Sequence, residues 1–541
     1  MKEQRLTLEQ IYTDSIHKYA DNTAFSLYNG ETLTYADFDK KVEQVRQELL
    51  AAGIKKGDKA ALLGTSMPNW NVCYFAAVTL GVVIVPILPD FSPNAIDAII
   101  EHSESKVLFA SDKLYAKVSK ETREKLDVII RLVNLKTVGG KALRADTPAV
   151  EREVPQPEDL VAIIYTSGTT SSPKGVMLSH KALSTQLHML DTLVRLRQDD
   201  VFLSVLPLSH TYECSLGMLF PFMWGASVVY LGLPPTPTSM LPALKDVRPT
   251  FMLTVPLIME KIYTRQVFAR FTKTKAMKAI YKVRFVRRIL HRIAGKKLMH
   301  TFGGRLRFFG IGGSKINKST EKFLRDARFP YSIGYGLTET APLLAGAVHP
   351  NTYLQSTGRV MKGIEVRLAD KNPKTGIGEL QVKTPCIMEG YFNNPEADKE
   401  AFTEDGWFST KDLALMDKTG RIFIKGRASN MIVGSSGENI YPEDIESILN
   451  QHELVTESLV IQQEGRLVAL VYLQDLKEDL KEHLAEVHAE IMEYVNSKVS
   501  KMSRITRILE QKSAFEKTPT LKIKRYLYTE GLKKRGKKQS S

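Results

Sequence analysis

Short runs of β-branched and aliphatic residues alternate with longer helix-like segments from the N-terminus to about Lys425. Examples of the short runs are DKAALLG, VVIVPIL, KVLFA, VFLSVLP, ASVVYLG, FMLTVP and RLRFFGIGG. Alternating strand and helix patterns predict mostly parallel sheets that are covered by helices. We therefore expect an α/β fold with a large N-terminal domain of layered sheets and helices.

The pattern changes after Arg427, where a smaller unit begins. It contains a helix-like segment, PEDIESILN, two strand-like segments, SLVIQQ and LVALVYL, and a polar helical stretch from about Lys477 to Val499. A chain of 541 residues is too long for one ordinary hydrophobic core, so at least two domains are expected. We expect the second domain to be a compact α+β lid.

The segment from Asn71 to Pro89 is apolar and nearly long enough to cross a bilayer. Gly81 divides it into a helix-like half and a β-branched half. This division favours a buried helix followed by a buried strand, and a membrane span is the alternative.

The cysteines and the N-terminus bear on the compartment. Cys73, Cys214 and Cys386 are widely spaced and form no CxxC pair, which excludes a disulfide framework or a structural zinc site and indicates a reducing cytoplasm. The first residues are charged, have the pattern of an amphipathic helix and lack the apolar stretch of a signal peptide. We expect a cytoplasmic protein.

Positive charge is concentrated in one part of the chain. The net charge is +15, but the stretch from Lys261 to Thr320 has 17 Lys and Arg residues and no Asp or Glu, which leaves 58 basic and 60 acidic residues elsewhere. Apolar residues recur there at three- and four-residue steps between arginines, which predicts a basic amphipathic helix that ends near Gly295. The apolar positions are Met277, Ile280, Val283, Val286, Leu290 and Ile293, and the arginines are Arg284, Arg287, Arg288 and Arg292.

Three interpretations of this basic segment remain open. The first is a helix packed on the domain with a solvated basic face. The second is a peripheral contact of the basic 261–307 segment with an anionic membrane, for example the inner membrane surface, where an amphiphilic substrate partitions. The third, nucleic-acid binding, lacks any recognised motif, and we expect no nucleic-acid partner.

A loop rich in Gly, Ser and Thr follows the apolar run LVAII. It spans Tyr165 to Val176, with the sequence YTSGTTSSPKGV. Hydroxyl groups, glycine backbone amides and one lysine can together enclose a polyphosphate. The loop is not a Walker motif, because Lys174 is followed by glycine rather than Ser or Thr. A P-loop ATPase is therefore disfavoured.

With this loop the sequence resembles the adenylate-forming superfamily, which includes acyl-CoA synthetases, firefly luciferase and the adenylation domains of peptide synthetases. The resemblance covers nearly the whole chain, and its motifs occur in the family's order. After the loop come LPLSHTYE (206–213), GIGGSKIN (310–317), YGLTET (335–340), GELQVKTPCIMEGY (378–391), DGWFSTKD (405–412), GRASNMIVGSSGENIYPEDIE (426–446) and KTPTLKIKR (517–525). The SHTYE and LKIKR segments are most similar to long-chain fatty acyl-CoA synthetases of the AMP-forming type.

The resemblance implies two domains and three ligands. Residues 1–425 would form the large adenylation domain, residues 426–430 the hinge, and residues 431–541 a mobile lid that carries the catalytic lysine. The ligands would be ATP, Mg²⁺ and coenzyme A, beside the acyl substrate. The lid would turn about the hinge between two half-reactions.

The nucleotide would be held by the motif residues. The leaving β- and γ-phosphates would be bound by Thr166, Ser167, Gly168, Thr169, Thr170 and Lys174. The ribose would be bound by Asp412 and Arg427, and the adenine would be bordered by Gly313, Ser314 and Tyr335. Mg²⁺, a hard cation that prefers oxygen ligands, would be held by Glu339 and Thr166. The alternative for Glu339 is a carboxylate that stabilises a helix N-terminus.

The catalytic group implied by the resemblance consists of Lys522, Thr338, Glu339 and His210. Thr338 would contact the α-phosphate, and Lys522 would reach from the lid to the substrate carboxylate. His210 would be a gate beside that carboxylate, and an ordinary hydrogen-bonded core histidine is an equal alternative. Gly437, in the loop from Gly434 to Asn439, would help to shape the pantetheine tunnel.

Three positions depart from the family pattern. Leu521 stands where a glycine commonly precedes the catalytic lysine, as in some long-chain enzymes. Lys411 replaces the usual glycine before the ribose aspartate, which could alter the local loop. Asn430 stands at the hinge, where an acidic residue or lysine is usual, and could change the balance between the two lid orientations.

Together these features predict ATP-dependent activation of a fatty acid, with long-chain acids preferred, to acyl-AMP and pyrophosphate. Transfer to coenzyme A would then give acyl-CoA and AMP. One alternative is the same adenylation with an acyl carrier protein as acceptor, or with a non-fatty carboxylate. A second is a membrane-associated acyl-binding relative without catalysis, which the retained motif residues disfavour.

Overall fold

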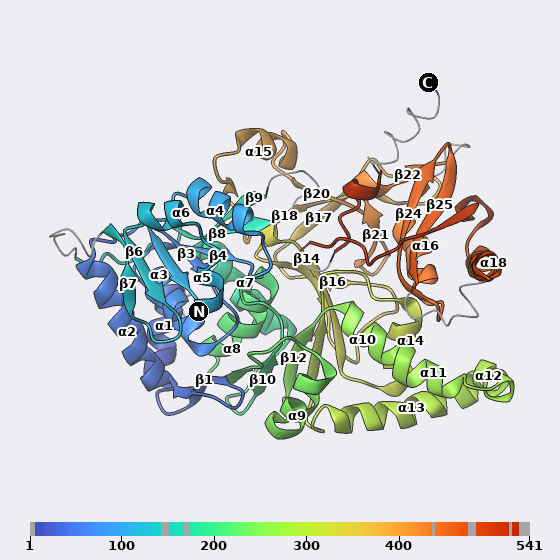
Figure 1. Cartoon of the computed structure of the whole chain (residues 1–541), viewed down its shortest axis with the longest axis horizontal. Helices are drawn as coiled ribbons and strands as arrows, with labels where there is room; N and C mark the ends of the chain where they lie inside the picture. The colour runs from blue at the N-terminus through green and yellow to red at the C-terminus, as the bar shows by residue number, and fades with distance from the viewer. Residues whose placement is uncertain are drawn as a thin grey trace.

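The computed structural model describes residues 6–141, 151–166, 173–434, 439–473, 483–518 and 522–529. Figure 1 shows a large N-terminal part, coloured blue to yellow, beside a smaller C-terminal part in orange and red. The large part contains two mixed sheets with helices on their faces, and the smaller part has its own three-stranded sheet. The expected α/β fold with a small α+β domain is therefore confirmed.

The first sheet of the large domain is parallel at its centre and ends in antiparallel pairs. Its antiparallel β8–β9 hairpin flanks the Gly/Ser/Thr-rich loop. The eight strands, in sheet order, are β19 (Gly390–Tyr391), β9 (Lys174–Ser179), β8 (Leu160–Thr166), β4 (Val83–Ile87), β3 (Lys59–Leu63), β5 (Val107–Ala110), β6 (Val128–Arg131) and β7 (Thr137–Gly139).

The second sheet is half parallel and half antiparallel. Its thirteen strands, in sheet order, are β17 (Glu365–Ala369), β18 (Gly378–Lys383), β20 (Phe408–Met416), β21 (Arg421–Arg427), β16 (Gly358–Val360), β15 (Leu343–Ala347), β14 (Tyr331–Gly336), β13 (Phe308–Ile311), β12 (Phe251–Thr254), β10 (Val201–Ser204), β11 (Ser227–Tyr230), β1 (Thr23–Leu27) and β2 (Thr32–Thr34). Strands from β14 to β1 pair in parallel, whereas those from β15 to β17 pair antiparallel. Short connections join β17 to β18 and β20 to β21, as antiparallel neighbours permit, whereas a parallel pair needs a long crossover.

The apolar segment from Asn71 to Pro89 is a buried helix and strand, as the sequence favours. It forms the end of α3 (Pro68–Thr79), in which every residue is buried, and then β4. Gly81 makes the turn between them with a φ of 71°. Among the described residues, no helix is both long and apolar enough to cross a membrane.

Helices cover the sheets of the large domain (Figure 1). The N-terminal segment forms the amphipathic helix expected from its sequence, and Thr7 and Gln10 close a capping box at its start. The helices are α1 (Leu8–Lys18), α2 (Tyr35–Ala51), α4 (Pro93–His102), α5 (Asp112–Tyr115), α6 (Lys120–Lys125), α7 (His180–Leu193), α8 (Phe220–Met223), α9 (Pro237–Val247), α10 (Pro256–Ile262), α11 (Ala269–Phe271), α14 (Lys318–Ala327) and α15 (Pro395–Ala401).

The basic amphipathic helix is divided and longer than predicted. It forms α12 (Lys275–Lys282) and α13 (Arg284–Thr301), with Val283 in an extended conformation between them. The prediction that the helix ends near Gly295 is wrong. Gly295 instead lets α13 approach α14, since a Cβ atom there would lie 2.6 Å from the Cβ of Ala327.

The small domain has a hydrophobic core of its own. Two helices and the residues on one face of its sheet form one cluster. The alternating residues of the same strands, including Leu459 and Leu470, form a second cluster with Phe515. Of the predicted polar helical stretch, α18 is described, and residues 477–482 lie outside the described ranges. The elements are β22 (Ile432–Val433), β23 (Asn439–Ile440), α16 (Pro442–Leu449), β24 (Val455–Gln463), β25 (Arg466–Leu473), α18 (Leu484–Asn496) and β26 (Arg507–Glu510).

Candidate active site

Three strands of the second sheet bring Tyr335, Asp412 and Arg427 together. Asp412 on β20 lies directly opposite Arg427 on β21, and its Oδ1 is 2.8 Å from the Arg427 Nε. The Tyr335 hydroxyl, on β14, donates to Asp412 Oδ2 at 2.7 Å. Asp412 is only 5% exposed, and this burial raises its pKa against the opposing effect of Arg427 and Tyr335. The carboxylate therefore has a fixed orientation before any ligand binds.

The turn that carries Asp412 contains one of the departures from the family pattern. Lys411 has a φ of 57°, in the left-handed region that a glycine adopts without strain. The lysine therefore keeps the backbone conformation that the usual glycine would favour. The departure leaves Asp412 paired in its ladder with Arg427.

Glu339 lies next to the phosphate-loop hairpin through Tyr391. Thr338 and Glu339 belong to the short 3-10 helix η4 (Thr338–Thr340) that follows β14. The Tyr391 hydroxyl donates to Glu339 Oε1 at 3.0 Å, and the Lys174 ammonium lies 5.2 Å from the centroid of the Tyr391 ring. One aromatic side chain thus links the predicted phosphate lysine to the predicted metal carboxylate.

The phosphate-loop residues are described only at the two ends of the loop. Thr166, the last residue of β8, is paired with Lys174, the first residue of β9. Ser167, Gly168, Thr169 and Thr170 lie outside the described residues, as does Gly437. Tyr391 is paired with Val176, so β19 and its tyrosine are positioned by the same hairpin.

Lys522 reaches this group from the small domain. Figure 1 shows the red C-terminal segment extending from that domain towards β14 and β21. Burial and the positive charge of Arg427 lower the pKa of Lys522, whereas Asp412 and Glu339 act in the opposite direction. The residue remains accessible to solvent, but protein from both domains replaces part of the water around its ammonium group.

Thr518 and Lys522 are joined by two hydrogen bonds. The Thr518 backbone N–H donates to the Lys522 carbonyl oxygen at 2.7 Å, and the Lys522 N–H donates to the Thr518 hydroxyl at 3.2 Å. Two ion pairs, Lys517 with Glu457 and Arg525 with Glu446, fasten the flanking residues to the small domain. The backbone of Lys522 is therefore tied to that of Thr518, and both residues belong to the small domain.

His210 lies in the SHTYE segment, just before Tyr212 and Glu213. Burial, and then the charge of Lys522, lower the His210 pKa to about 4, so the imidazole is neutral at physiological pH. The Tyr212 ring packs closely against Gly312 of the GIGGSKIN segment. A Cβ atom added at Gly312 would lie 3.1 Å from the ring. Gly313, with a φ of 85°, and Ser314 are exposed and follow β13, whose neighbour β14 carries Tyr335.

Glu213, which follows Tyr212, begins the π-helix η2 (Glu213–Leu219). Such helices are often found at functional sites. The Glu213 carboxyl group is 1% exposed. Ser204 donates to its Oε1 at 2.5 Å, and among the described residues its Oε2 has no hydrogen-bond partner. Burial raises the Glu213 pKa to about 8, so the group is largely protonated at neutral pH.

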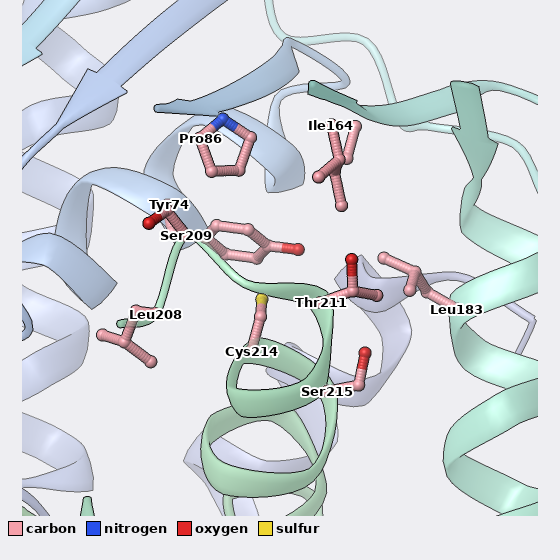
Figure 2. A pocket seen from close by; sticks show the side chains of 10 residues that line it. Tyr74, Pro86, Ile164, Leu183, Leu208, Ser209, Thr211, Cys214 and Ser215 are labelled. Atoms are coloured by element: carbon pink, nitrogen blue, oxygen red, sulfur yellow. The ribbon is translucent and has the colours of Figure 1, made fainter. Parts of the chain in front are cut away.

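A small cavity lies beside η2 (Figure 2). Its volume is about 10 Å³, which is roughly enough for one water molecule. Figure 2 shows Thr211 and Cys214 facing the space below Pro86 and Ile164. The cavity is much smaller than a fatty acyl chain, so we do not assign it to the substrate.

The two domains also meet at the α16 helix. The Lys315 ammonium lies 2.7 Å from Asp444 Oδ1, and the Asn317 amide donates to the Ser447 carbonyl oxygen at 2.8 Å. The Asn430 side chain, at the predicted hinge, donates to Glu443 Oε1 at 2.7 Å. These polar contacts hold α16 against the segment that follows β13.

Two family models match most of the chain. The family model described as AMP-binding enzyme matches residues 12–392, and the model described as AMP-binding enzyme C-terminal domain matches residues 429–534. The chain belongs to the AMP-binding enzyme family.

Relatives of this AMP-binding enzyme span most of its length. It is 27% identical over 555 residues to the long-chain-fatty-acid–CoA ligase FadD15 of Mycobacterium bovis, covering 92% of this chain and 90% of that protein. It is 26% identical over 558 residues to the long-chain-fatty-acid–[acyl-carrier-protein] ligase AEE15 of Arabidopsis thaliana, covering 86% and 76%. The solved structure of the anthranilate CoA ligase AuaEII with anthranoyl-AMP superposes with a TM-score of 0.78 at 20% identity over 97% of each chain.

The residues of this AMP-binding enzyme fit a magnesium ion that is held mainly by a nucleotide. Among the described residues, no group of three or more His, Cys, Asp or Glu side chains is placed to hold a metal alone. Mg²⁺ usually binds through one or two carboxylates together with substrate phosphates. Glu339, next to the phosphate-loop hairpin, is a carboxylate of that kind.

Sequence reasoning missed two residues of the site. Tyr391 ends a motif of the resemblance, but its link to Lys174 and Glu339 depends on the pairing of β19 with β9, which sequence does not give. Glu213 was included in the SHTYE segment without a role. An acidic residue within the apolar run that follows His210 is the signal that could have identified it.

Replacing Glu213 with glutamine should reduce the loss of stability as pH rises from 5 to 8. Between about pH 4.5 and pH 8, the folded wild-type protein keeps a proton that the unfolded chain has released. Stability must then fall as pH rises through this window, by about 1.4 kcal/mol per pH unit at most. Denaturation midpoints from pH 5 to pH 8 should show a smaller decline for Glu213→Gln. The exposed Glu404→Gln control should follow the wild type, and an unchanged slope in Glu213→Gln would contradict the neutral carboxyl group.

Proposed function

We propose that this chain is an AMP-forming acid–CoA ligase that activates a fatty acid, with long-chain acids preferred. The observation that carries the proposal is the approach of Lys522, from the small domain, to Asp412, Glu339 and His210 of the large domain. An arrangement of one mobile cation beside fixed nucleotide ligands suits the attack of a carboxylate on a phosphate. The domain limits we propose are 1–425, 426–430 and 431–541.

In the first half-reaction, a carboxylate oxygen forms a bond to the α-phosphorus of ATP, and the bond to the bridging oxygen breaks. Pyrophosphate leaves with both bonding electrons. We propose that Lys174 and the neighbouring hydroxyls hold this leaving group, and that Thr338 contacts the α-phosphate. Lys522 would offset the charge of the attacking anion, and neutral His210 would border it. Mg²⁺ would neutralise phosphate charge beside Glu339 and Thr166.

The nucleotide's sugar and base have separate proposed partners. Asp412 has two oxygens fixed by Arg427 and Tyr335, and each retains a lone pair for a ribose hydroxyl. Arg427 would border the same sugar. Gly313, Ser314 and Tyr335, at the ends of β13 and β14, would border the adenine.

In the second half-reaction, the thiolate of coenzyme A attacks the acyl carbon, and AMP leaves. The thiol proton passes to solvent. We propose that the small domain turns at residues 426–430 between the two steps, and that Gly437 then borders the pantetheine chain. The few polar contacts of α16 and Asn430 support this, because exposed ion pairs and single hydrogen bonds contribute little free energy each.

The acceptor and the acid are the two parts of the proposal that need direct tests. Coenzyme A is favoured by relatives such as FadD15, whereas AEE15 uses an acyl carrier protein. Product analysis with coenzyme A, with holo-acyl carrier protein and with neither will separate these acceptors.

A reducing compartment is supported by three free, buried cysteines.

A panel of acids should show a preference for palmitate. AMP release with coenzyme A and acetate, octanoate, palmitate or benzoate should be fastest with palmitate, followed by octanoate. The expectation rests on the SHTYE and LKIKR segments and on FadD15. A preference for benzoate or acetate would reject the fatty acid and retain the ligase. Absence of acid-dependent ATP–pyrophosphate exchange with every acid would instead support a silent acyl-binding relative.

A further inference from the structure

The hairpin of α12 and α13 exposes large apolar side chains along one ridge. On α13, Phe285, Ile289 and Ile293 are 73%, 42% and 59% exposed, and Ile280 and Val283 nearby are 52% and 53% exposed. The three α13 residues are four positions apart, so they lie on one side of the helix. Single exposed apolar residues are ordinary on a protein surface, but a contiguous group of them marks an interaction site.

Arginine and lysine side chains lie beside this ridge on α13. Arg284, Arg288, Arg292 and Lys296 also follow one another at four-residue steps on α13, and all are exposed. Within the part of the chain that the structure describes, Arg288 alone among these four has an acidic partner, Asp326, at 3.6 Å. The surface therefore combines unpaired positive charge with apolar groups, which is typical of helices that lie in the interface of an anionic membrane.

Buried hydrogen bonds hold the hairpin in this orientation. The Tyr263 and Tyr281 hydroxyls are 3.2 Å apart, and the Tyr281 hydroxyl is 2.7 Å from His291 Nε2. The other ring nitrogen of His291 is 3.0 Å from Asp326 Oδ2. Because Tyr281 and His291 are buried, turning the ridge inward would leave polar groups without partners. The ridge is therefore a fixed, outward-facing feature.

We propose that the α12–α13 hairpin docks the protein on an anionic lipid bilayer. Phe285, Ile289 and Ile293 would enter the headgroup region, and the cations of α13 would lie against lipid phosphates. Figure 1 shows the hairpin at the outer edge of the large domain, away from the strands that carry Tyr335 and Asp412. A nucleic acid would match the charge but would leave the apolar ridge uncovered. Docking itself does not depend on the proposed ligase reaction.

Vesicle sedimentation tests this proposal. The wild-type chain should bind vesicles of equal parts phosphatidylglycerol and phosphatidylcholine, should bind phosphatidylcholine alone at least tenfold more weakly, and should lose affinity with added salt. The triple variant Phe285→Ser/Ile289→Ser/Ile293→Ser should bind anionic vesicles at least tenfold more weakly. Arg284→Gln/Arg292→Gln/Lys296→Gln should bind anionic vesicles about 100-fold more weakly, because each lost charge costs about fivefold. Val133→Ser, which removes an equally exposed apolar side chain elsewhere (58%), should bind like the wild type.

Thermal unfolding and turnover of octanoate, a soluble acid, should be unchanged in all three variants, which shows that they are folded. The proposal is overturned if the wild type does not bind anionic vesicles, or if the apolar triple variant binds them as well as the wild type. Capture of holo-acyl carrier protein or DNA by this surface, without vesicle binding, would also overturn it. An inactive wild-type chain that still binds vesicles through the ridge would reject the ligase reaction and leave the docking surface in place.

Discussion

Lys522→Ala should form acyl-adenylate about 10²–10³-fold more slowly than the wild type. This is the usual loss when one preorganised group that stabilises developing charge is removed. Acid-dependent ATP–pyrophosphate exchange measures this step. The exchange rate of the wild type should also fall at alkaline pH as the ammonium loses its proton. Because the Lys522 pKa is lowered, this fall should begin below the pH expected for an ordinary lysine.

The same variant should retain the second half-reaction. With synthetic acyl-AMP and coenzyme A, Lys522→Ala should produce acyl-CoA within a few-fold of the wild-type rate. Lys524→Ala is a matched control, since Lys524 lies two residues away and its ammonium is 3.7 Å from Glu516 Oε2. An undiminished exchange rate in folded Lys522→Ala would reject the role of this lysine, and equal losses in both half-reactions would indicate general damage to the site.

Glu339→Gln should slow adenylation by about 10²-fold or more at limiting Mg²⁺. Glutamine keeps the size of the side chain and can still accept the Tyr391 hydrogen bond, but it removes the negative charge that a hard cation requires. Calorimetric titration supplies a readout apart from turnover. The affinity for ATP with Mg²⁺ should fall at least tenfold, whereas the affinity for ATP with a chelator should change little.

Glu389→Gln provides the comparison for this prediction. Glu389 is an exposed carboxylate two residues before Tyr391, so its replacement alters the charge of the same segment without touching Glu339. We expect wild-type turnover and wild-type Mg²⁺ dependence. If Glu339→Gln kept the wild-type gain in ATP affinity on addition of Mg²⁺, Glu339 would be a helix-terminal carboxylate only.

Much of the nucleotide site could be predicted because its residues are in local motifs at strand ends. The resemblance assigns Tyr335, Asp412 and Arg427 to one nucleotide, and β14, β20 and β21 place these three residues in direct contact. The roles assigned to these residues stay predictions until ligands are tested. The α/β fold was also predictable, because the strand and helix patterns alternate so regularly.

Features that depend on packing were not predictable. The periodicity around Val286 and Leu290 correctly indicated a helix, but it did not show that Ile280 and Ile293 would face solvent. Gly295 is an ordinary helix-ending signal, and the close approach of α14 overrides it. The left-handed Lys411 and the link through Tyr391 likewise depend on neighbouring strands that are distant in sequence.

The reciprocal hydrogen bonds between Thr518 and Lys522 have a consequence for the order of events. Because these bonds tie the backbone of Lys522 to the small domain, a movement of that domain carries the cation with it. In the proposed cycle, the positive charge that assists the anionic attack on ATP leaves as the thiol arrives. One rigid-body movement would therefore alter both the electrostatic field and the access route at the acyl carbon.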